Sequence, residues 1–288
     1  MRIGLCTTDY ERALPAGKLF DSIAAVGFEA VQLAFCNVAE CGFTAADHIE
    51  IPEAVSPDAL TAIKKAARDT GLVIGAVNGT WNMAHSDKAI REEGLRRFDG
   101  FLAAVAELEC PIVSLCSGTR SSVNLWQYDE ATSRPDAWDD CLDSMRRAAA
   151  LAEKYGIVLA IESEASNVID SPEAARRIMD EVGSANLKMI LDAANLFHAG
   201  KARVENVRPT LDKAMEYFGR DIVLAHGKDI HAGDGIDFCG TGFGIVDFRY
   251  MIDGLKKAGF DGDMMLHGIY SEPDFPACLS FMKRCMGR

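Results

Sequence analysis

Several sequence signals that assign a chain to a common functional class are missing from these 288 residues. No two cysteines have the C-x-x-C spacing of metal-binding and redox motifs, and the nine cysteines are an odd number. No run of Lys or Arg is longer than a pair and the net charge is −13, which disfavours nucleic acid as a partner. No apolar run has membrane length, and no signal peptide precedes the first strand-like run. We therefore expect reduced thiols, a cytoplasmic location, and neither a membrane nor a nucleic-acid partner.

Three familiar catalytic motifs are also absent. The first expected turn, Thr7–Tyr10, lacks the G-x-G-x-x-G of dinucleotide-binding folds. The run Gly240–Gly244 lacks the G-K-[ST] ending of a phosphate loop, so we expect a turn there. No G-x-S-x-G nucleophile elbow occurs either.

Strand-like and helix-like segments alternate along the whole chain. Eight apolar runs have the length of buried strands: Ile3–Thr7, Ala30–Phe35, Leu72–Asn78, Ile112–Ser117, Val158–Ser163, Leu187–Leu191, Ile222–His226 and Met264–His267. The helical segments between and after them are Phe20–Gly27, Pro57–Thr70, Lys88–Glu107, Asp136–Tyr155, Pro172–Val182, Val207–Phe218, Phe248–Ala258 and Phe275–Met286. Eight such units predict an α/β fold, a (β/α)8 TIM barrel, rather than a doubly wound open sheet. No linker divides the chain, so we expect residues 1–288 to form a single domain.

Four of the later strands end in side chains that can bind a metal ion. Glu162, Asp192, His226 and His267 each follow a short apolar run. In a barrel the carboxyl ends of the strands meet at one opening, where the long connecting loops also lie. Since a buried, unpaired carboxylate is costly, two carboxylates and two imidazoles that converge there favour a divalent cation. The alternatives for single residues are a salt bridge for Glu162, a helix cap for Asp192 and a core histidine for His226.

The segments around these positions resemble the sugar phosphate isomerase/epimerase family, whose fold is the xylose isomerase-like TIM barrel. The resemblance rests on Ala160–Glu162, Leu191–Asn195, His226–Asp229 and Gly240–Gly242, and it covers essentially the whole chain. Ketose 3-epimerases, inosose isomerase, inosose dehydratase and apurinic endonucleases belong to the same superfamily. The resemblance therefore implies an enzyme that acts on a small carbohydrate, and it leaves room for a homo-oligomer.

The resemblance also implies one divalent metal ion (Mn, Mg, Co or Zn), bound by Glu162, Asp192 and His226. The fourth family ligand is a strand-eight glutamate, which in ketose 3-epimerases also serves as one of two proton-transfer bases. His267 stands at that position here, and we expect it to bind the metal. A ligating imidazole has only its other nitrogen free, so it is less suited to act as a base. Glu164 and Glu272 are alternative sources of that base.

Further side chains are expected to contact the substrate: Trp81, His85, Arg120, Trp126, Asn195, His198 and Glu272. An indole can pack against a sugar face, and a guanidinium can hold a carboxylate or a phosphate. The family often has a histidine where Asn195 stands, and His198 can cover part of that role. Lys228 lies on the same side as His226; it can polarise a carbonyl, or it can neutralise Asp229 or Glu162.

These residues predict a metal-dependent isomerase or epimerase of a small sugar, keto-sugar or inosose. A carboxylate, Glu162 or its neighbour Glu164, removes a proton next to a carbonyl that the metal and Lys228 polarise. A dehydratase or lyase on a keto-sugar or inosose is the main alternative, because His267 removes the second base. An apurinic endonuclease and a non-catalytic metabolite-binding barrel are weaker alternatives. The former would use Asp229 and His231 as further ligands.

Overall fold

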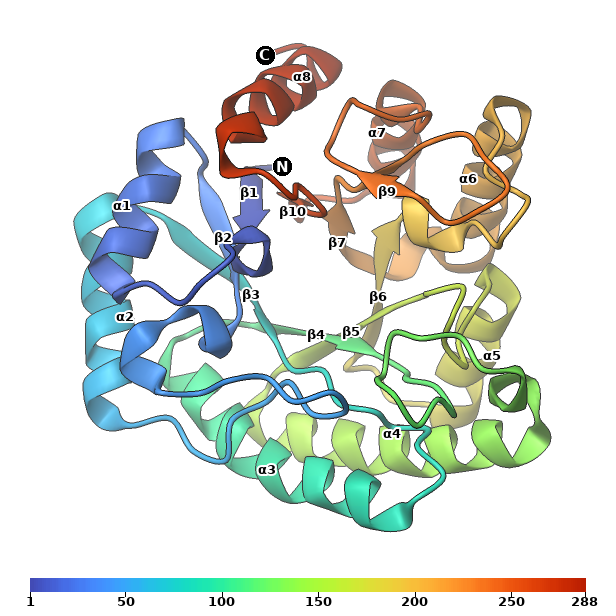
Figure 1. Ribbon diagram of the computed structural model, residues 1–288, viewed down its shortest axis with the longest axis horizontal. Helices are drawn as coiled ribbons and strands as arrows, with labels where there is room; N and C mark the ends of the chain where they lie inside the picture. Colours follow the sequence, from blue (N-terminus) through green and yellow to red (C-terminus); the bar gives the residue numbers. More distant parts are fainter.

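The computed structural model describes residues 1–288 and contains a closed barrel of eight parallel strands (Figure 1). The strands are β1 (Ile3–Cys6), β2 (Ala30–Leu33), β3 (Val73–Asn78), β4 (Ile112–Cys116), β5 (Val158–Glu162), β6 (Leu187–Asp192), β7 (Ile222–His226) and β10 (Asp263–Leu266). The sheet closes because β1 pairs with both β2 and β10. All eight predicted strands are present, and the (β/α)8 TIM barrel is confirmed.

Eight helices surround the barrel, one after each strand unit. They are α1 (Ala16–Val26), α2 (Pro57–Thr70), α3 (Lys88–Glu107), α4 (Pro135–Tyr155), α5 (Pro172–Val182), α6 (Val204–Phe218), α7 (Phe248–Ala258) and α8 (Phe275–Met286). Helix α1 begins four residues earlier than predicted, because Pro15 directly precedes the helix and fixes its start. A short hairpin after β7, formed by β8 (Asp229–Ile230) and β9 (Phe238–Cys239), was not predicted.

The helix ends follow the signals in the sequence. Ser56 Oγ accepts a hydrogen bond from the Ala59 N–H at the start of α2, and Pro57 occupies the first helical position. Helix α2 ends at Gly71, whose φ of 73° lies in the left-handed region that favours glycine. Such glycine stops keep the connections at the amino ends of the strands short, so the long loops all lie at the carboxyl ends. We call the opening at these carboxyl ends the mouth.

Two hydrophobic clusters hold the barrel together. The larger one joins the outer faces of the strands to the helices and contains 75 buried residues. The smaller one draws on seven strands: Cys6, Ala30, Ala76, Ala160, Ile190, Leu224 and Met265. Met265 fills the barrel interior closely, because a Cβ on Gly4 would lie 2.3 Å from its sulfur. The interior is therefore packed, and the mouth has a solid floor.

All nine cysteines are free thiols, and six of them are buried. None of the helices combines the length and the apolar composition that crossing a bilayer requires.

Candidate metal centre at the barrel mouth

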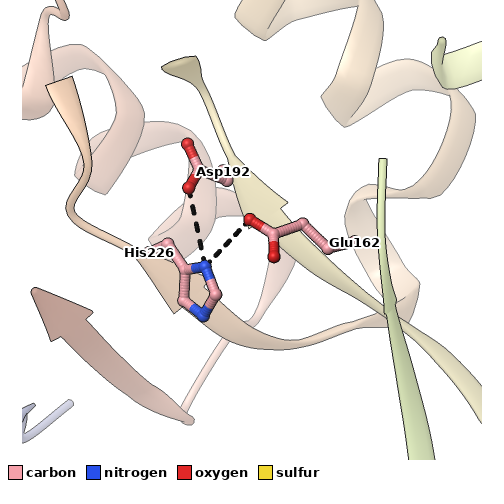
Figure 2. Close-up of side chains that lie close together, drawn as sticks. All are labelled: Glu162, Asp192 and His226. Carbon is pink, nitrogen blue, oxygen red and sulfur yellow. Dashed lines mark hydrogen bonds and ion pairs between the residues drawn. The ribbon is translucent and has the colours of Figure 1, made fainter. Parts of the chain in front are cut away.

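Three of the predicted ligands meet at the mouth, each as the last residue of its strand (Figure 2). The ligand atoms of Glu162, Asp192 and His226 all lie within 4.8 Å of one another. His226 Nδ1 is 3.0 Å from Glu162 Oε1 and 3.5 Å from Asp192 Oδ2. All three side chains are buried. Parallel pairing of β5, β6 and β7 brings them together, because it places strand ends at a common level.

The hydrogen bond of the other ring nitrogen, Nε2, determines which nitrogen of a neutral His226 carries the proton. His226 Nε2 lies 2.9 Å from Gln32 Oε1, and an amide oxygen can only accept, so Nε2 donates. Gln32 cannot readily turn over, because its Nε2 donates to Asn78 Oδ1 at 2.9 Å and to Ser114 Oγ at 3.1 Å. Nδ1 of a neutral His226 therefore directs a lone pair toward two carboxylates. A positive charge must sit among these three groups, either a proton or a metal ion.

In the absence of a cation, a proton takes that place. Burial lowers the pKa of His226, but Glu162 and Asp192 outweigh this effect and raise the pKa to about 9. Burial raises the pKa of Glu162, but the charge of His226 and its hydrogen bond outweigh it, so the pKa of Glu162 is well below its usual range. The cluster is therefore strongly attractive to positive charge.

One buried oxygen remains without a hydrogen bond, and it favours a metal ion. Asp192 Oδ1 accepts hydrogen bonds from the backbone N–H groups of Ala194 and Asn195, at 2.9 and 3.3 Å. Asp192 Oδ2 is buried beside His226 and accepts no hydrogen bond. Such an orphaned oxygen, together with a carboxylate and an imidazole nitrogen, is a donor set that suits a divalent cation. The three residues thus fit the metal ion that the sequence predicts.

Asn195 orients one ligand of this cluster by a hydrogen bond. Its Nδ2 donates to Glu162 Oε1 at 2.7 Å, which sets the orientation of that carboxylate. Its Oδ1 is buried and accepts no hydrogen bond. Asn195 was predicted to contact the substrate, and it lines the cavity while it holds a ligand in place.

His267 stands apart from the three. It directly follows β10, with its ring centroid 5.5 Å from that of His226. His267 Nδ1 lies 3.0 Å from Asp9 Oδ1, and Asp9 also accepts hydrogen bonds from the backbone of Gly268 and Ile269. Because a carboxylate oxygen accepts, Nδ1 of His267 donates this hydrogen bond. Nε2 is then the ring nitrogen that can bind a ligand at the mouth. A ligand role for His267 stays a prediction.

Glu164 and Lys228 complete the buried charges at the mouth. Lys228 Nζ lies 3.9 Å from Asp192 Oδ2 and 4.0 Å from the centre of the Phe238 ring. It does not neutralise Asp229, whose carboxylate accepts four backbone N–H groups in and beyond the β8–β9 hairpin. Burial raises the pKa of Glu164 to about 8, with Lys228 opposing this shift. Burial lowers the pKa of Lys228, but the nearby carboxylates outweigh it and the net shift is upward.

These groups line a cavity of about 420 Å³. Several of its lining residues were not predicted: Thr8, Gln32, Glu50, Asn78, Thr80, Ser114, Cys116, Phe238 and Tyr270. Polar residues inside apolar strand runs, such as Gln32 and Ser114, were a usable signal, because a buried polar group needs a partner. Trp126 was predicted, and it lines the cavity with 43% of its surface exposed.

Trp81 and His85 do not reach this cavity, which corrects their predicted contact with the substrate. Trp81 is fully buried and packs on Phe98, with ring centroids 4.7 Å apart. The absence of a side chain on Gly94 makes room for its indole, since a Cβ there would lie 2.1 Å from the ring. His85 is buried in the loop after β3, where its Nδ1 accepts the Asp87 N–H at 3.0 Å.

Arg120 is a structural residue rather than a ligand for a substrate anion. Its guanidinium is buried and donates to the Ala84 carbonyl at 2.8 Å. The same group pairs with Asp136 at 3.1 Å and Asp140 at 2.8 Å. The carboxylates that Arg120 holds in the structure are those of α4, and not of a substrate.

His198 and Glu272 also lie outside the cavity. The His198 side chain is 47% exposed, and its Nε2 is 3.1 Å from the Asp170 carbonyl oxygen. Glu272 is exposed in the 3₁₀ turn before α8. The prediction for Glu272 assumed that its loop would swing inward, whereas the side chain is exposed.

Comparison with known proteins agrees with the fold. The family model described as "Xylose isomerase-like TIM barrel" matches residues 20–285. Inosose dehydratase from Geobacillus thermodenitrificans is 19% identical over 135 residues, which are 44% of this chain and 45% of that enzyme. A D-psicose 3-epimerase from Clostridium cellulolyticum H10, solved with D-tagatose, has a TM-score of 0.73 at 15% identity over 99% of both chains. The IOLI protein, solved with a zinc atom, has a TM-score of 0.69 at 15% identity over 99% of this chain and 96% of that one.

Proposed function

The chain belongs to the xylose isomerase-like TIM barrel family, and from this premise we propose that it is a divalent-metal-dependent isomerase or epimerase of a small sugar, keto-sugar or inosose. The observation that carries the proposal is the buried cluster of Glu162, Asp192 and His226, with its orphaned carboxylate oxygen, beside a polar cavity that Glu162 and His226 line. Relatives that process sugars and inososes support the substrate class.

Each charged group has a proposed role. Glu162, Asp192 and His226 hold the metal, and His267 is the fourth residue proposed for the site. A divalent cation held there supplies Lewis-acid polarisation of a carbonyl oxygen, which acidifies the adjacent C–H group. Manganese, magnesium, cobalt and zinc all suit the donor set, and zinc is the ion of the IOLI structure.

The proton itself is moved by carboxylates of this chain. Glu162, or Glu164 two residues beyond it, takes the proton from the carbon beside the carbonyl. Lys228 is buried within the same cavity, so its ammonium group can stabilise the negative charge that develops on the substrate oxygen. Return of the proton to another carbon isomerises the substrate, and return to the opposite face epimerises it.

A dehydratase or lyase on a keto-sugar or inosose is the second candidate. Two observations favour it: the similarity to inosose dehydratase over part of the chain, and a histidine where the family has its strand-eight glutamate. The same proton abstraction would then be followed by loss of a β-hydroxyl or another β-linked group. Products distinguish this candidate, because only elimination releases water or an alcohol.

The weaker alternatives receive less support from the site. Asp229 is committed to backbone N–H groups, and His231 pairs at the surface with Asp237 at 2.9 Å. Neither joins the ligand cluster as an apurinic endonuclease would require, and a net charge of −13 disfavours DNA. A non-catalytic metabolite-binding barrel would hold the metal and a sugar but exchange no substrate proton.

Deuterium exchange at the carbon next to the carbonyl tests the proposal. Wild-type protein with manganese is incubated in D2O with a panel of keto-sugars and inososes, and ¹H NMR follows loss of the C–H signal. We expect exchange with at least one compound, and a loss of about 100-fold or more in Glu162→Gln. Glu205→Gln, a change at an exposed glutamate of α6, is the matched control and should exchange normally. Absence of exchange with every compound would refute the proposal.

A further inference from the structure

The ammonium group of Lys228 is buried at the cavity, yet it donates no hydrogen bond to any atom of the protein. Lys228 lies between β7 and β8, lines the cavity, and has only 6% of its surface exposed. Its one ion pair joins Nζ to Asp192 Oδ2 at 3.9 Å, which is too long for a hydrogen bond. Because a lysine is rarely buried without a close partner, another contact must hold the ammonium group in this place.

That contact is the aromatic ring of Phe238. Lys228 Nζ lies 4.0 Å from the centre of the ring, which is well within the distance at which an aromatic face attracts a cation. Phe238 belongs to β9 and lines the same cavity. An aromatic face attracts the positive charge but accepts no strong hydrogen bond. The three N–H groups of Lys228 therefore stay free for oxygen atoms of a substrate.

The aliphatic stem of Lys228 is confined as well. It runs close to the backbone of Gly268, just after β10, where a Cβ would lie 2.8 Å from Lys228 Cγ and 2.9 Å from Cδ. Gly268 has a φ of 72°, in the left-handed region that favours glycine, and its N–H donates to Asp9 Oδ1 at 3.1 Å. The stem thus packs against a fixed piece of backbone, and the ring of Phe238 determines where the ammonium group at its end lies.

The place of Phe238 depends on the β8–β9 hairpin, which a buried carboxylate secures. Phe238 pairs with Ile230 across the antiparallel hairpin. Asp229, the residue after Lys228, accepts four backbone N–H groups at 2.9 or 3.0 Å, one from Ile230 and three from the loop that follows β9. The hairpin and this loop are therefore tied to the residue next to Lys228, which keeps the ring over the ammonium group.

We propose that Phe238 is the positioning residue of Lys228: its ring holds the ammonium group at the cavity and leaves all three N–H groups to the substrate. The inference rests on the proposed function, in which Lys228 stabilises the negative charge that develops on a substrate oxygen, and it adds the residue that presents the lysine. A carboxylate in place of the ring would instead occupy the N–H groups and neutralise the charge.

A double-mutant cycle on deuterium exchange tests the proposal. The proteins are compared in D2O with manganese, on a keto-sugar or inosose whose C–H the wild type exchanges. Phe238→Leu keeps an apolar side chain but has no ring, and we expect kcat for exchange to fall about 10-fold while KM stays within about threefold. Phe238→Tyr keeps the ring and should stay within about threefold of wild type in both constants. In a Lys228→Met background, Phe238→Leu should change kcat by less than about twofold, because the ammonium group is already absent.

Controls separate this role from a general effect on the fold. Phe243→Leu makes the same change at a phenylalanine that is 49% exposed and does not line the cavity, and it should leave kcat and KM unchanged. Manganese stoichiometry in Phe238→Leu should equal that of wild type. Urea unfolding of the four proteins of the cycle examines the contact without any substrate. Phe238→Leu should cost more stability in the wild-type background than in the Lys228→Met background.

Three results would overturn the proposal. Wild-type kcat in Phe238→Leu would exclude a positioning role for the ring. An equal fall in kcat in both backgrounds would mean that Phe238 acts on the substrate or on the fold, and not through Lys228. A Phe238→Tyr variant as slow as Phe238→Leu would exclude attraction to the ring as the cause. By contrast, a wild-type protein that exchanges no sugar proton refutes the proposed function. The urea cycle then decides on the contact alone, and equal losses of stability in both backgrounds would overturn it.

Discussion

Asn195 is not one of the metal ligands, yet removal of its side-chain amide should weaken metal binding. Asn195 Nδ2 donates to Glu162 Oε1 at 2.7 Å, and both side chains are buried. A hydrogen bond to a charged group contributes about 1.5–3 kcal/mol, so we expect Asn195→Ala to lower the free energy of unfolding by about 2 kcal/mol. Loss of an outer partner of a metal ligand costs roughly 10–100-fold in affinity, which equals about 1.4–2.7 kcal/mol.

Isothermal titration with manganese measures the affinity, and urea unfolding with a chelator measures the stability of the metal-free protein. Asn186→Ala is a matched control, because Asn186 also donates one side-chain hydrogen bond, to the Ile157 carbonyl at 3.1 Å, but lies before the start of β6. It should lose stability and keep its metal affinity. Asn195→Asp adds a third carboxylate to Glu162 and Asp192, so the variant should be less stable without metal and regain stability when metal is added. Metal affinity in Asn195→Ala within about threefold of wild type would refute this account of the cluster.

Two further predictions concern residues outside the cavity. Arg120→Ala should lower the free energy of unfolding by about 2 kcal/mol in urea titrations, because Asp140 and the Ala84 carbonyl lose a buried partner; a raised KM with unchanged stability would instead mean that Arg120 binds substrate. The hydrogen bond from Arg288 is the largest of the effects that lower the pKa of Glu29 from 4.5 to about 2. Its contribution to stability is therefore present above about pH 5 and disappears as the pH falls toward 2, so the difference in urea midpoint between wild type and Glu29→Gln should shrink over that range. A difference that is independent of pH would contradict this linkage.

The strands and the three ligands could be predicted because both depend on local sequence. A short apolar run that ends in a polar residue determines a buried strand and places that residue at the mouth. Glu162, Asp192 and His226 are parts of such runs, so the fold alone brings them together. To predict that the three ligands converge, we also needed the order of the strands around the barrel, which follows from the alternation of strands and helices.

Residues in loops could not be placed in the same way. Trp81 and Trp126 both follow a strand end, yet one is fully buried against Phe98 and the other is exposed at the mouth. The difference comes from Gly94, which lies in the following helix and leaves space for one indole. Glu50 was missed for a similar reason, since its place depends on a contact between two loops. Three expectations stay predictions: a single domain over residues 1–288, association into a homo-oligomer, and a cytoplasmic location.

Elemental analysis of wild-type protein purified without chelators, then incubated with manganese and desalted, tests the metal centre most directly. The geometry of Glu162, Asp192 and His226 predicts about one divalent ion per chain, and almost none in Asp192→Asn, which replaces the orphaned carboxylate oxygen with a weaker ligand. Wild-type protein that retains no manganese, magnesium, cobalt or zinc after incubation with each would contradict the account. In that case the proton on His226 would be the only positive charge that the cluster holds.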